Sequence, residues 1–250
     1  MKVVTFNIRR DCDGGTLHSF ENRKPLIREK ILSEQADIIG FQEVLPHVGN
    51  WLEEALDGYC VLNCGRGAGF DDESESIAFL KEKYRLLKYD TFWLSPTEDI
   101  PGSRYEDQSE FPRVCSMAVL QQKGTGMCLA VFNTHLDHES ESARRKGILK
   151  ILNAMAKCPF PAILTGDLNT FSGSKVERLI ALSGLELTDA TAEVGVTFHN
   201  YGDASEQLDH IYVGKEWACI SAQKWVDCQD GIYLSDHYPV CVELKFNTEQ

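Results

Sequence analysis

The chain has 250 residues, 43% of them hydrophobic, and its 38 Asp and Glu residues outnumber its 25 Lys and Arg residues. This length and composition suit one sizeable globular domain or two small ones, with a substantial apolar core. The formal charge of −13 at pH 7 argues against sequence-independent binding of nucleic acid, because such binding depends on a basic surface. A small anionic substrate, or a metal ion between two anionic groups, fits this charge better.

The sequence predicts no membrane segment. No apolar run is long enough to cross a bilayer, and the N-terminal stretch MKVVTFNIRR lacks the apolar region of a signal peptide. The nine cysteines are scattered and form no CxxC pair, a distribution that is typical of reduced thiols. We therefore expect a soluble, cytoplasmic protein without a membrane partner.

Eight short runs of β-branched or aliphatic residues are predicted to be strands. In chain order they are Lys2–Asn7, Asp37–Gln42, Ile77–Leu80, Val114–Leu120, Met127–Thr134, Ala162–Thr165, His210–Val213 and Pro239–Leu244. Several of these runs are almost entirely apolar, which favours strands that are covered on both faces.

Amphipathic helices are predicted between the strands. Pro25 is expected to open the first helix, and a second is expected to run from about Glu141. A third should begin at Ser174, which forms a capping box with Glu177, and should stop at Gly184. Because strands and helices alternate without a break in composition, the pattern predicts an α/β domain.

Polar side chains recur where the predicted strands begin or end. They are Asn7, Glu43, His135, Asp167 with Asn169, Asp209 with His210, and Asp236 with His237. In α/β proteins the loops at strand ends commonly carry function. Each of these groups alone is weak support for a site, but together they indicate one.

The six segments TFNIR, DIIGFQEV, FNTHLDH, LTGDLN, LDHIYV and LSDHYPV resemble the endonuclease/exonuclease/phosphatase superfamily. The resemblance runs from Val3 to Val242 in the family's motif order, and the stretch from Phe92 to Arg113 looks like the deadenylase-like branch and its bacterial relatives. It implies a four-layer α/β sandwich, in which two mixed β-sheets pack face to face with helices outside. It also implies hydrolysis of phosphate esters with Mg²⁺ or Mn²⁺.

Three residues are predicted to hold the metal ion. Glu43 is the first candidate, because hard divalent cations prefer oxygen ligands. Asn7 is expected beside it, either as a carbonyl ligand or as a donor to the substrate phosphate. Asp236 resembles the family's second acidic position near the metal, as a ligand or as a contact to water. The competing interpretation makes Glu43 a solvated strand end and Asn7 a turn former.

Five residues are predicted to be catalytic: Asp167, Asn169, His237, Asp209 and His135. Asp167 would orient or deprotonate the attacking water, and Asn169 would hold the phosphate. His237 would contact a phosphoryl oxygen, while Asp209 would fix its tautomer. His135 would donate to the phosphate or to the leaving oxygen. The division of acid and base roles stays open, and GDLN could alternatively be an ordinary Asx turn.

Further polar residues have two interpretations each. Arg113 is a candidate donor fork for the phosphate, with a surface ion pair as the equal alternative. His210, where the family often has an aromatic residue, is expected to pack rather than to perturb ionisation. The acidic run from Asp71 to Glu75 is expected to be a solvated loop. Three histidines are expected at the surface or in loops: His18, His47 and His199.

These inferences predict a divalent-metal-dependent hydrolase that acts on a small phosphorylated metabolite, such as a sugar phosphate or a nucleotide. One alternative is a nuclease on DNA or RNA, for which Phe92, Trp93, Tyr105 and Phe111 are candidates to stack on a base. Another alternative is an inactive binding module that kept the fold. It is disfavoured because every polar position of the motif set is filled.

Overall fold

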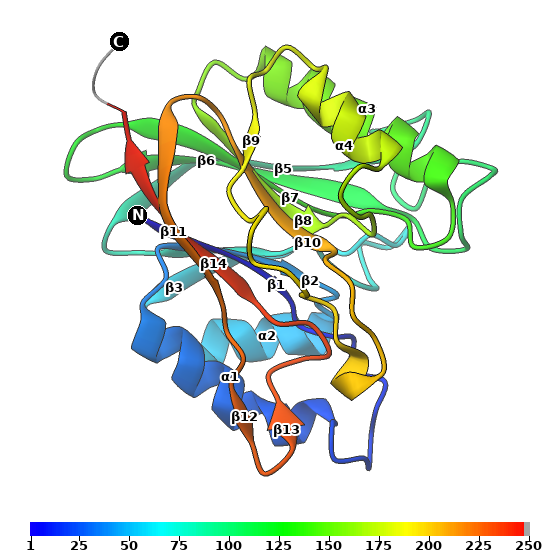
Figure 1. Ribbon diagram of the computed structural model, residues 1–250, viewed down its shortest axis with the longest axis vertical. Helices are drawn as coiled ribbons and strands as arrows, with labels where there is room; N and C mark the ends of the chain where they lie inside the picture. The colour runs from blue at the N-terminus through cyan, green and yellow to red at the C-terminus, as the bar shows by residue number, and fades with distance from the viewer. Residues whose placement is uncertain (248–250) are drawn as a thin grey trace.

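Two six-stranded β-sheets form the centre of the computed structural model, which describes residues 1–247 (Figure 1). The first sheet consists, in spatial order, of β11 (Trp217–Lys224), β14 (Val240–Phe246), β1 (Lys2–Asn7), β2 (Ile38–Gln42), β4 (Ile77–Leu80) and β3 (Tyr59–Leu62). The second consists of β5 (Tyr84–Trp93), β6 (Val114–Gln122), β7 (Cys128–His135), β8 (Ala162–Asp167), β10 (Asp209–Val213) and β9 (Thr188–Asp189).

Both sheets are mixed. In the first, β1 runs parallel to β2 and antiparallel to β14. In the second, β7 runs parallel to β8, and β8 runs antiparallel to β10. The facing sides of the two sheets share an apolar core, in which Val3 and Ile77 of the first sheet pack with Leu120 and Ile163 of the second.

Helices cover the outer face of each sheet, so that the molecule has four layers (Figure 1). The helices α1 (Phe20–Glu34) and α2 (Pro46–Ala55) pack against the first sheet, and α3 (Glu141–Lys157) and α4 (Lys175–Ala181) pack against the second. A 3-10 turn η1 (Asn200–Gly202) and a hairpin of β12 (Cys228–Gln229) and β13 (Ile232–Tyr233) complete the elements. The predicted four-layer α/β sandwich is confirmed.

All eight predicted strands are present, and their ends lie within two residues of the prediction. The strands that we did not predict are short, or they lie at sheet edges with solvated side chains. The clearest case is β5, whose sequence YRLLKYDTFW carries charged residues on its exposed side while it pairs along its length with β6. An edge strand of this kind has no continuous apolar run to mark it.

The first helix begins five residues earlier than predicted, at Phe20, so Pro25 lies inside it. Proline lacks the N–H that would bond to the carbonyl of Glu21. Burial of Phe20 and Ile27 against the first sheet holds the turn in place despite this loss. We also did not predict α2, although Pro46 at its first position is a common helix start.

The helix α4 is capped as predicted but ends sooner. Ser174 accepts a hydrogen bond at 3.1 Å from the backbone N–H of Glu177. The helix ends at Ala181, three residues before Gly184. Over residues 1–247, the structure contains no helix with the length and apolar character needed to cross a membrane.

Candidate active site

The carboxyl ends of β1 and β2 bring Asn7 and Glu43 together. These strands are parallel neighbours, and Asn7 is in register with Gln42. Glu43 has a φ of 64°, a left-handed backbone conformation that turns the chain directly after β2. The side-chain nitrogen of Asn7 donates to Oε1 of Glu43 at 2.9 Å, and the backbone N–H of Arg10 donates to Oε2 at 2.6 Å.

The end of β1 is fixed by a buried arginine of α1. The guanidinium of Arg23 donates to the backbone carbonyls of Ile8 at 2.6 Å, Leu234 at 2.9 Å and Arg9 at 3.2 Å. These hydrogen bonds join the segment after β1 to the segment before β14. They therefore position both Asn7 and the loop that carries His237.

In the second sheet, three further predicted residues lie side by side at the ends of neighbouring strands. His135 is in register with Asp167 across the parallel pair of β7 and β8, and Asp167 is in register with Asp209 across the antiparallel pair of β8 and β10. Nε2 of His135 lies 3.5 Å from Oδ2 of Asp167. The register of three adjacent strands thus sets this row of side chains.

Asn7 joins the two sheets. Its side-chain nitrogen donates both to Glu43 and to Oδ2 of Asp167, the latter at 3.0 Å. Asp167 also accepts a hydrogen bond at 2.9 Å from the backbone N–H of Asn169. Glu43 and Asp167, which are far apart in the sequence, are therefore neighbours across one amide group.

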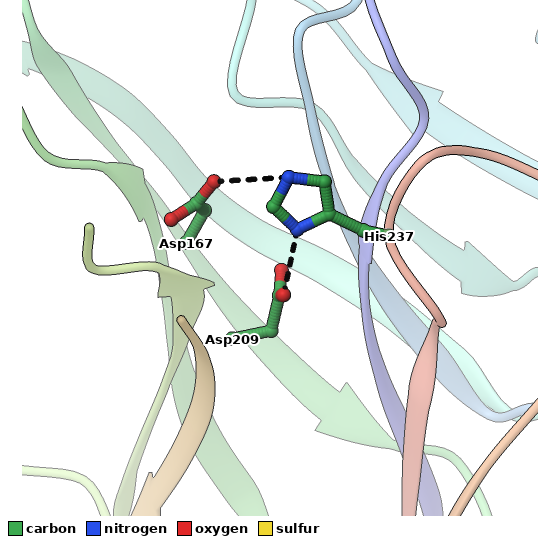
Figure 2. A group of neighbouring side chains, drawn as sticks. All are labelled: Asp167, Asp209 and His237. Carbon is green, nitrogen blue, oxygen red and sulfur yellow. Dashed lines mark hydrogen bonds and ion pairs between the residues drawn. The ribbon is translucent and has the colours of Figure 1, made fainter. Parts of the chain in front are cut away.

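His237 stands between two carboxylates, as Figure 2 shows. Its Nδ1 lies 2.8 Å from Oδ2 of Asp209, and its Nε2 lies 3.8 Å from Oδ2 of Asp167. Burial opposes the charged imidazole, but Asp209 and Asp167 outweigh it and raise the pKa of His237 to about 10. Burial, reinforced by Asp209, raises the pKa of Asp167 to about 7 against the opposing effect of His237.

The second imidazole of the site is held neutral. Burial lowers the pKa of His135 well below its ordinary value, and the nearby guanidiniums of Arg113 and Arg66 act in the same direction. The site therefore combines a protonated His237 with an uncharged His135.

These residues surround one cavity of about 410 Å³. Its walls contain most of the residues predicted for the site: Glu43, Arg113, His135, Asp167, Asn169, Asp236 and His237. Asn7 and Asp209 are 1% exposed and support the wall from behind through Glu43, Asp167 and His237. The alternative that Glu43 is only a solvated strand end does not fit this arrangement.

The geometry agrees with comparisons to known proteins. The model of the Endonuclease/Exonuclease/phosphatase family matches residues 4–237. The chain belongs to the endonuclease/exonuclease/phosphatase family. Its members are phosphoesterases and nucleases, so the protein is an enzyme of the phosphoesterase class.

Solved structures of this family align over nearly the whole chain. A family member from Bacteroides vulgatus is 30% identical, with a TM-score of 0.93 over 98% of each chain. The mannosyl-6-phosphatase of Bacteroides thetaiotaomicron is 28% identical, with a TM-score of 0.88 over 98% of this chain and all of that one. A more distant structure, D. rerio TDP2 with a single-strand DNA product, is 16% identical, with a TM-score of 0.77 over 98% of each chain, and shows the fold alone.

Within this family site, the oxygens suited to a divalent cation lie around Asn7. Glu43 and Asp167 supply carboxylate oxygens, which hard cations prefer, on either side of the amide nitrogen of Asn7. The amide oxygen of Asn7, a further donor of this kind, accepts from the backbone N–H of Arg9 at 3.0 Å. One atom each of Asp167, Asp209 and His237 also lie within 4.8 Å of one another. Asp236 is placed differently, because its Oδ2 accepts from Nη1 of Arg9 at 2.6 Å.

Arg113 lies in the cavity wall and is only 4% exposed, so the alternative of a surface ion pair is wrong. Its Nη2 donates to Nδ1 of His138 at 2.9 Å, and its Nε lies 3.8 Å from Asp137. Asn169 is half-buried in the same wall, with its side-chain nitrogen donating to the carbonyl of Leu136 at 2.9 Å.

The prediction that the stretch from Asp71 to Glu75 is a solvated loop is wrong. Glu73 is 4% exposed and Glu75 is fully buried. Glu73 lies 2.9 Å from Nη1 of Arg66 and 2.8 Å from Nη1 of Arg10, and these guanidiniums compensate its charge. We did not predict Arg66, Arg10 or Glu73 for the site, although all three line the cavity. Their only sequence signal is the glycine-rich stretch CGRGAGF around Arg66.

Of two further histidines, one agrees with its expectation and the other differs from it. His199 is in a loop as predicted, but it is buried and stacks on Tyr238 with ring centroids 4.0 Å apart. His210 does more than pack like an aromatic residue, because its Nδ1 lies 2.8 Å from Oδ2 of Asp189. Burial opposes protonation, but Asp189 raises the pKa of His210, and His210 in turn lowers the pKa of Asp189 despite its burial.

The pair of His210 and Asp189 predicts a stability that depends on pH. The raised pKa of His210 means that its contribution is fully present below the unfolded value, about 6.5, and is lost as the pH rises through the folded value. The lowered pKa of Asp189 means that its contribution is present above about 3.9 and is lost as the pH falls. The pair should therefore stabilise most strongly between those two values.

We expect His210→Gln to lower the free energy of unfolding by about 3 kcal/mol near pH 6 and by clearly less at pH 9. Urea unfolding of both proteins at the two pH values measures this difference. His47→Gln is the matched control, because His47 is exposed and pairs with Asp11 at the surface. An equal loss for His210→Gln at both pH values would show that the charged pair contributes nothing.

Proposed function

We propose that the protein hydrolyses phosphate esters of small metabolites, such as sugar phosphates or nucleotides, with Mg²⁺ or Mn²⁺ as its cofactor. The observation that carries this proposal is the amide of Asn7, which joins Glu43 of one sheet to Asp167 of the other beside His237. Two carboxylates, an amide and two imidazoles in one cavity suit a reaction in which water displaces an alcohol from phosphorus. We assign this activity to a single domain over residues 1–250.

We assign the metal ion to Glu43 and Asn7. The carboxylate of Glu43 lies beside Asp167, and the amide oxygen of Asn7, which accepts from the backbone N–H of Arg9 at 3.0 Å, keeps a second lone pair for the cation. The Oδ2 of Asp236 is instead held by the charged Nη1 of Arg9 at 2.6 Å. Asp236 would become a third ligand or a contact to metal-bound water only if Arg9 released it. When bound, a divalent cation would screen the negative charge of the phosphoryl oxygens and polarise the attacking water.

We assign the proton transfers to the second sheet. Asp167 would orient the attacking water and accept its proton, which suits a carboxylate whose pKa is raised to about 7 by burial and Asp209. The protonated His237, held by Asp209, would stabilise charge on a phosphoryl oxygen. The neutral His135 would donate to the phosphate or to the leaving oxygen.

The remaining predicted residues would bind the substrate. Arg113 would contact the phosphate from the cavity wall. Asn169 has one amide hydrogen engaged by the carbonyl of Leu136, so its second amide hydrogen is left for the phosphate. Asn7 would serve the substrate only through the metal, because both of its amide hydrogens are used by Glu43 and Asp167.

The charge of the chain favours a small substrate over nucleic acid. The chain as a whole carries −13, so a polyanion would meet repulsion beyond its scissile phosphate. The 28% identity to a mannosyl-6-phosphatase supports the same choice. Because its nine cysteines are all unpaired, we also propose a cytoplasmic location.

A nuclease is the second candidate, because aromatic rings flank the cavity. Phe111 and Phe198 are half-buried in its wall and suit stacking on a base or on a sugar. Of the other aromatic residues considered for stacking, Trp93 is buried and donates to the carbonyl of Arg66 at 2.7 Å, so it supports the wall instead.

A substrate panel with Mg²⁺ and with Mn²⁺ decides between the two candidates. It compares free phosphate released from sugar phosphates and nucleotides with cleavage of labelled DNA and RNA oligonucleotides. We expect phosphate release from at least one class of small monoester, and its loss when the ions are removed with EDTA. Cleavage of oligonucleotides without phosphate release would make the nuclease the first candidate. No turnover of any ester would favour an inactive binding module.

A further inference from the structure

The cavity wall contains two buried arginines, Arg66 and Arg113, with side chains only 2% and 4% exposed. All four basic residues that line the cavity are arginines and none is a lysine, although the chain is acidic overall. Arginine presents a planar set of donors that matches phosphate oxygens better than the point charge of lysine. Burying two such charges removes them from water, and a binding role would account for this cost.

The loop that carries Arg66 is built to hold it in place. A Cβ atom at Gly65 would lie 2.3 Å from the carbonyl oxygen of Asp71, and one at Gly67 would lie 2.2 Å from Oδ1 of the same residue. Gly65 approaches the backbone, so only glycine fits there, whereas a side chain at residue 67 would have to displace the carboxylate of Asp71. The backbone of Arg66 is fixed further, because its N–H donates to the carbonyl of Glu73 at 2.8 Å and its carbonyl accepts from Nε1 of Trp93 at 2.7 Å.

The guanidinium of Arg66 is oriented as well as buried. Its Nη1 lies 2.9 Å from Glu73 and its Nε lies 3.3 Å from Asp72. Its Cζ also lies over the ring of Phe111, 5.0 Å from the centroid. Because Phe111 lines the same cavity, this contact keeps the guanidinium at the cavity wall.

Arg113 carries donors that the described residues leave without a partner. Its Nε and Nη1 are buried and make no hydrogen bond within residues 1–247. Asp137, 3.8 Å from Nε, is occupied by other donors, because its oxygens accept from Ser109 and from the backbone of residues 139 and 140. Within residues 1–247, the single side-chain hydrogen bond of Arg113 goes to Nδ1 of His138.

A buried guanidinium with unpartnered N–H groups, next to a second guanidinium, destabilises the folded protein unless an anion binds to it. Burial, together with the neighbouring Arg66, lowers the pKa of Arg113 against the opposing effect of nearby carboxylates, of which Glu75 acts most strongly. A phosphate monoester at neutral pH carries nearly two negative charges and three terminal oxygens, whereas a diester carries one charge and two such oxygens. Two guanidiniums therefore match the charge and the terminal oxygens of a monoester better than those of a diester.

We propose that Arg66 and Arg113 form a clamp that recognises the terminal phosphoryl group of a monoester and thereby makes this enzyme a phosphomonoesterase. This inference rests on the proposed function and adds the type of ester to it. In the reaction, water adds to phosphorus, the bond from phosphorus to the alcohol oxygen breaks, and that oxygen gains a proton. The products are the free alcohol and inorganic phosphate, both of which leave the cavity.

The test compares kcat/KM for p-nitrophenyl phosphate, a monoester, with that for bis-p-nitrophenyl phosphate, a diester. The native protein should prefer the monoester by about 100-fold or more, as two charge-assisted contacts imply. Arg113→Lys and Arg66→Lys keep the charge but remove the donor fork. Each should lower kcat/KM for the monoester about tenfold and that for the diester by clearly less. Arg85→Ala, at an exposed position of β5, is the control and should change neither value.

A binding measurement tests the clamp without relying on turnover or on the folding of Arg66→Lys. Calorimetric titration with inorganic phosphate in the presence of Mg²⁺ should give a Kd about tenfold weaker for Arg113→Lys than for the native protein or Arg85→Ala. If Arg66→Lys fails to fold, as judged by circular dichroism, Arg113→Lys gives the same answer.

Three outcomes separate the two proposals. Equal use of both esters, with Arg113→Lys lowering both to the same degree, would overturn the clamp and leave the phosphoesterase intact. Turnover of neither ester nor of any metabolite would overturn the proposed function. In that case an unchanged Kd for phosphate in Arg113→Lys would overturn the clamp too, whereas a weakened one would support it as an anion site.

Discussion

Asp167→Asn is expected to lower kcat by about 10²–10⁴-fold, the usual contribution of a general base. The change keeps the size of the side chain but removes its ability to accept a proton from water. It also replaces one of the carboxylate oxygens that accept from Asn7 and from the backbone of Asn169 with a donor. Steady-state rates of phosphate release, measured with saturating Mg²⁺, give the comparison.

The matched control for Asp167→Asn is Asp37→Asn. Asp37 is also buried and hydrogen-bonded, to the backbone N–H of Lys2 at 2.7 Å and to Nζ of Lys83 at 2.9 Å, but it lies at the opposite end of the strands. We expect this variant to lose stability and to keep nearly the native kcat. A native rate in Asp167→Asn would refute the assigned role, whether or not the control behaves as expected.

Glu43→Gln is expected to weaken the affinity for the metal ion more than any other single change. The side chain would lose the negative charge that attracts the cation. It would also keep only one of the two hydrogen bonds that Oε1 and Oε2 accept from Asn7 and Arg10, because the amide nitrogen of Gln cannot accept. Outer-sphere partners of a metal commonly contribute about 10–100-fold to its affinity, so a direct ligand should contribute at least about 100-fold. The measurement is the concentration of Mg²⁺ that gives half-maximal activity.

Glu53→Gln serves as the control for Glu43→Gln. Glu53 lies in α2 near Glu43 in the sequence, is exposed, and accepts from the side chain of Asn63 at 3.0 Å. Its variant should require the same Mg²⁺ concentration as the native protein. If Glu43→Gln also required the same concentration, the metal would have to be held elsewhere, and the ligand assignment would be wrong.

The parts of the fold that the sequence predicts well are those that local pattern determines. Buried strands such as β1 and β8 are continuous apolar runs, and their polar ends mark where loops begin. The motif at each strand end then identifies Asn7, Glu43 and Asp167 as site residues before any contact is known. Asn7 and Glu43 meet through the pairing of the parallel strands β1 and β2, whereas Asp167 reaches Asn7 from the other sheet, through the packing of the two sheets.

The parts that escape prediction depend on contacts between distant segments. Glu73 lies in an acidic stretch that is typical of a solvated loop, yet it is buried because Arg66 and Arg10 reach it from elsewhere in the chain. Arg10 is 63 positions away from Glu73, and no periodicity connects them. The pairing of His210 with Asp189 is equally invisible to local pattern, because it depends on the neighbouring strands β9 and β10.

A crystal of the protein grown with Mn²⁺ and inorganic phosphate would test the shared site most directly, since Mn²⁺ is located by its anomalous scattering. We expect one strong anomalous peak within coordination distance of oxygens from Glu43 and Asn7, with a phosphate oxygen between this ion and the imidazole of His237. A fully occupied ion bound away from Glu43, or a phosphate bound outside the cavity, would contradict the account.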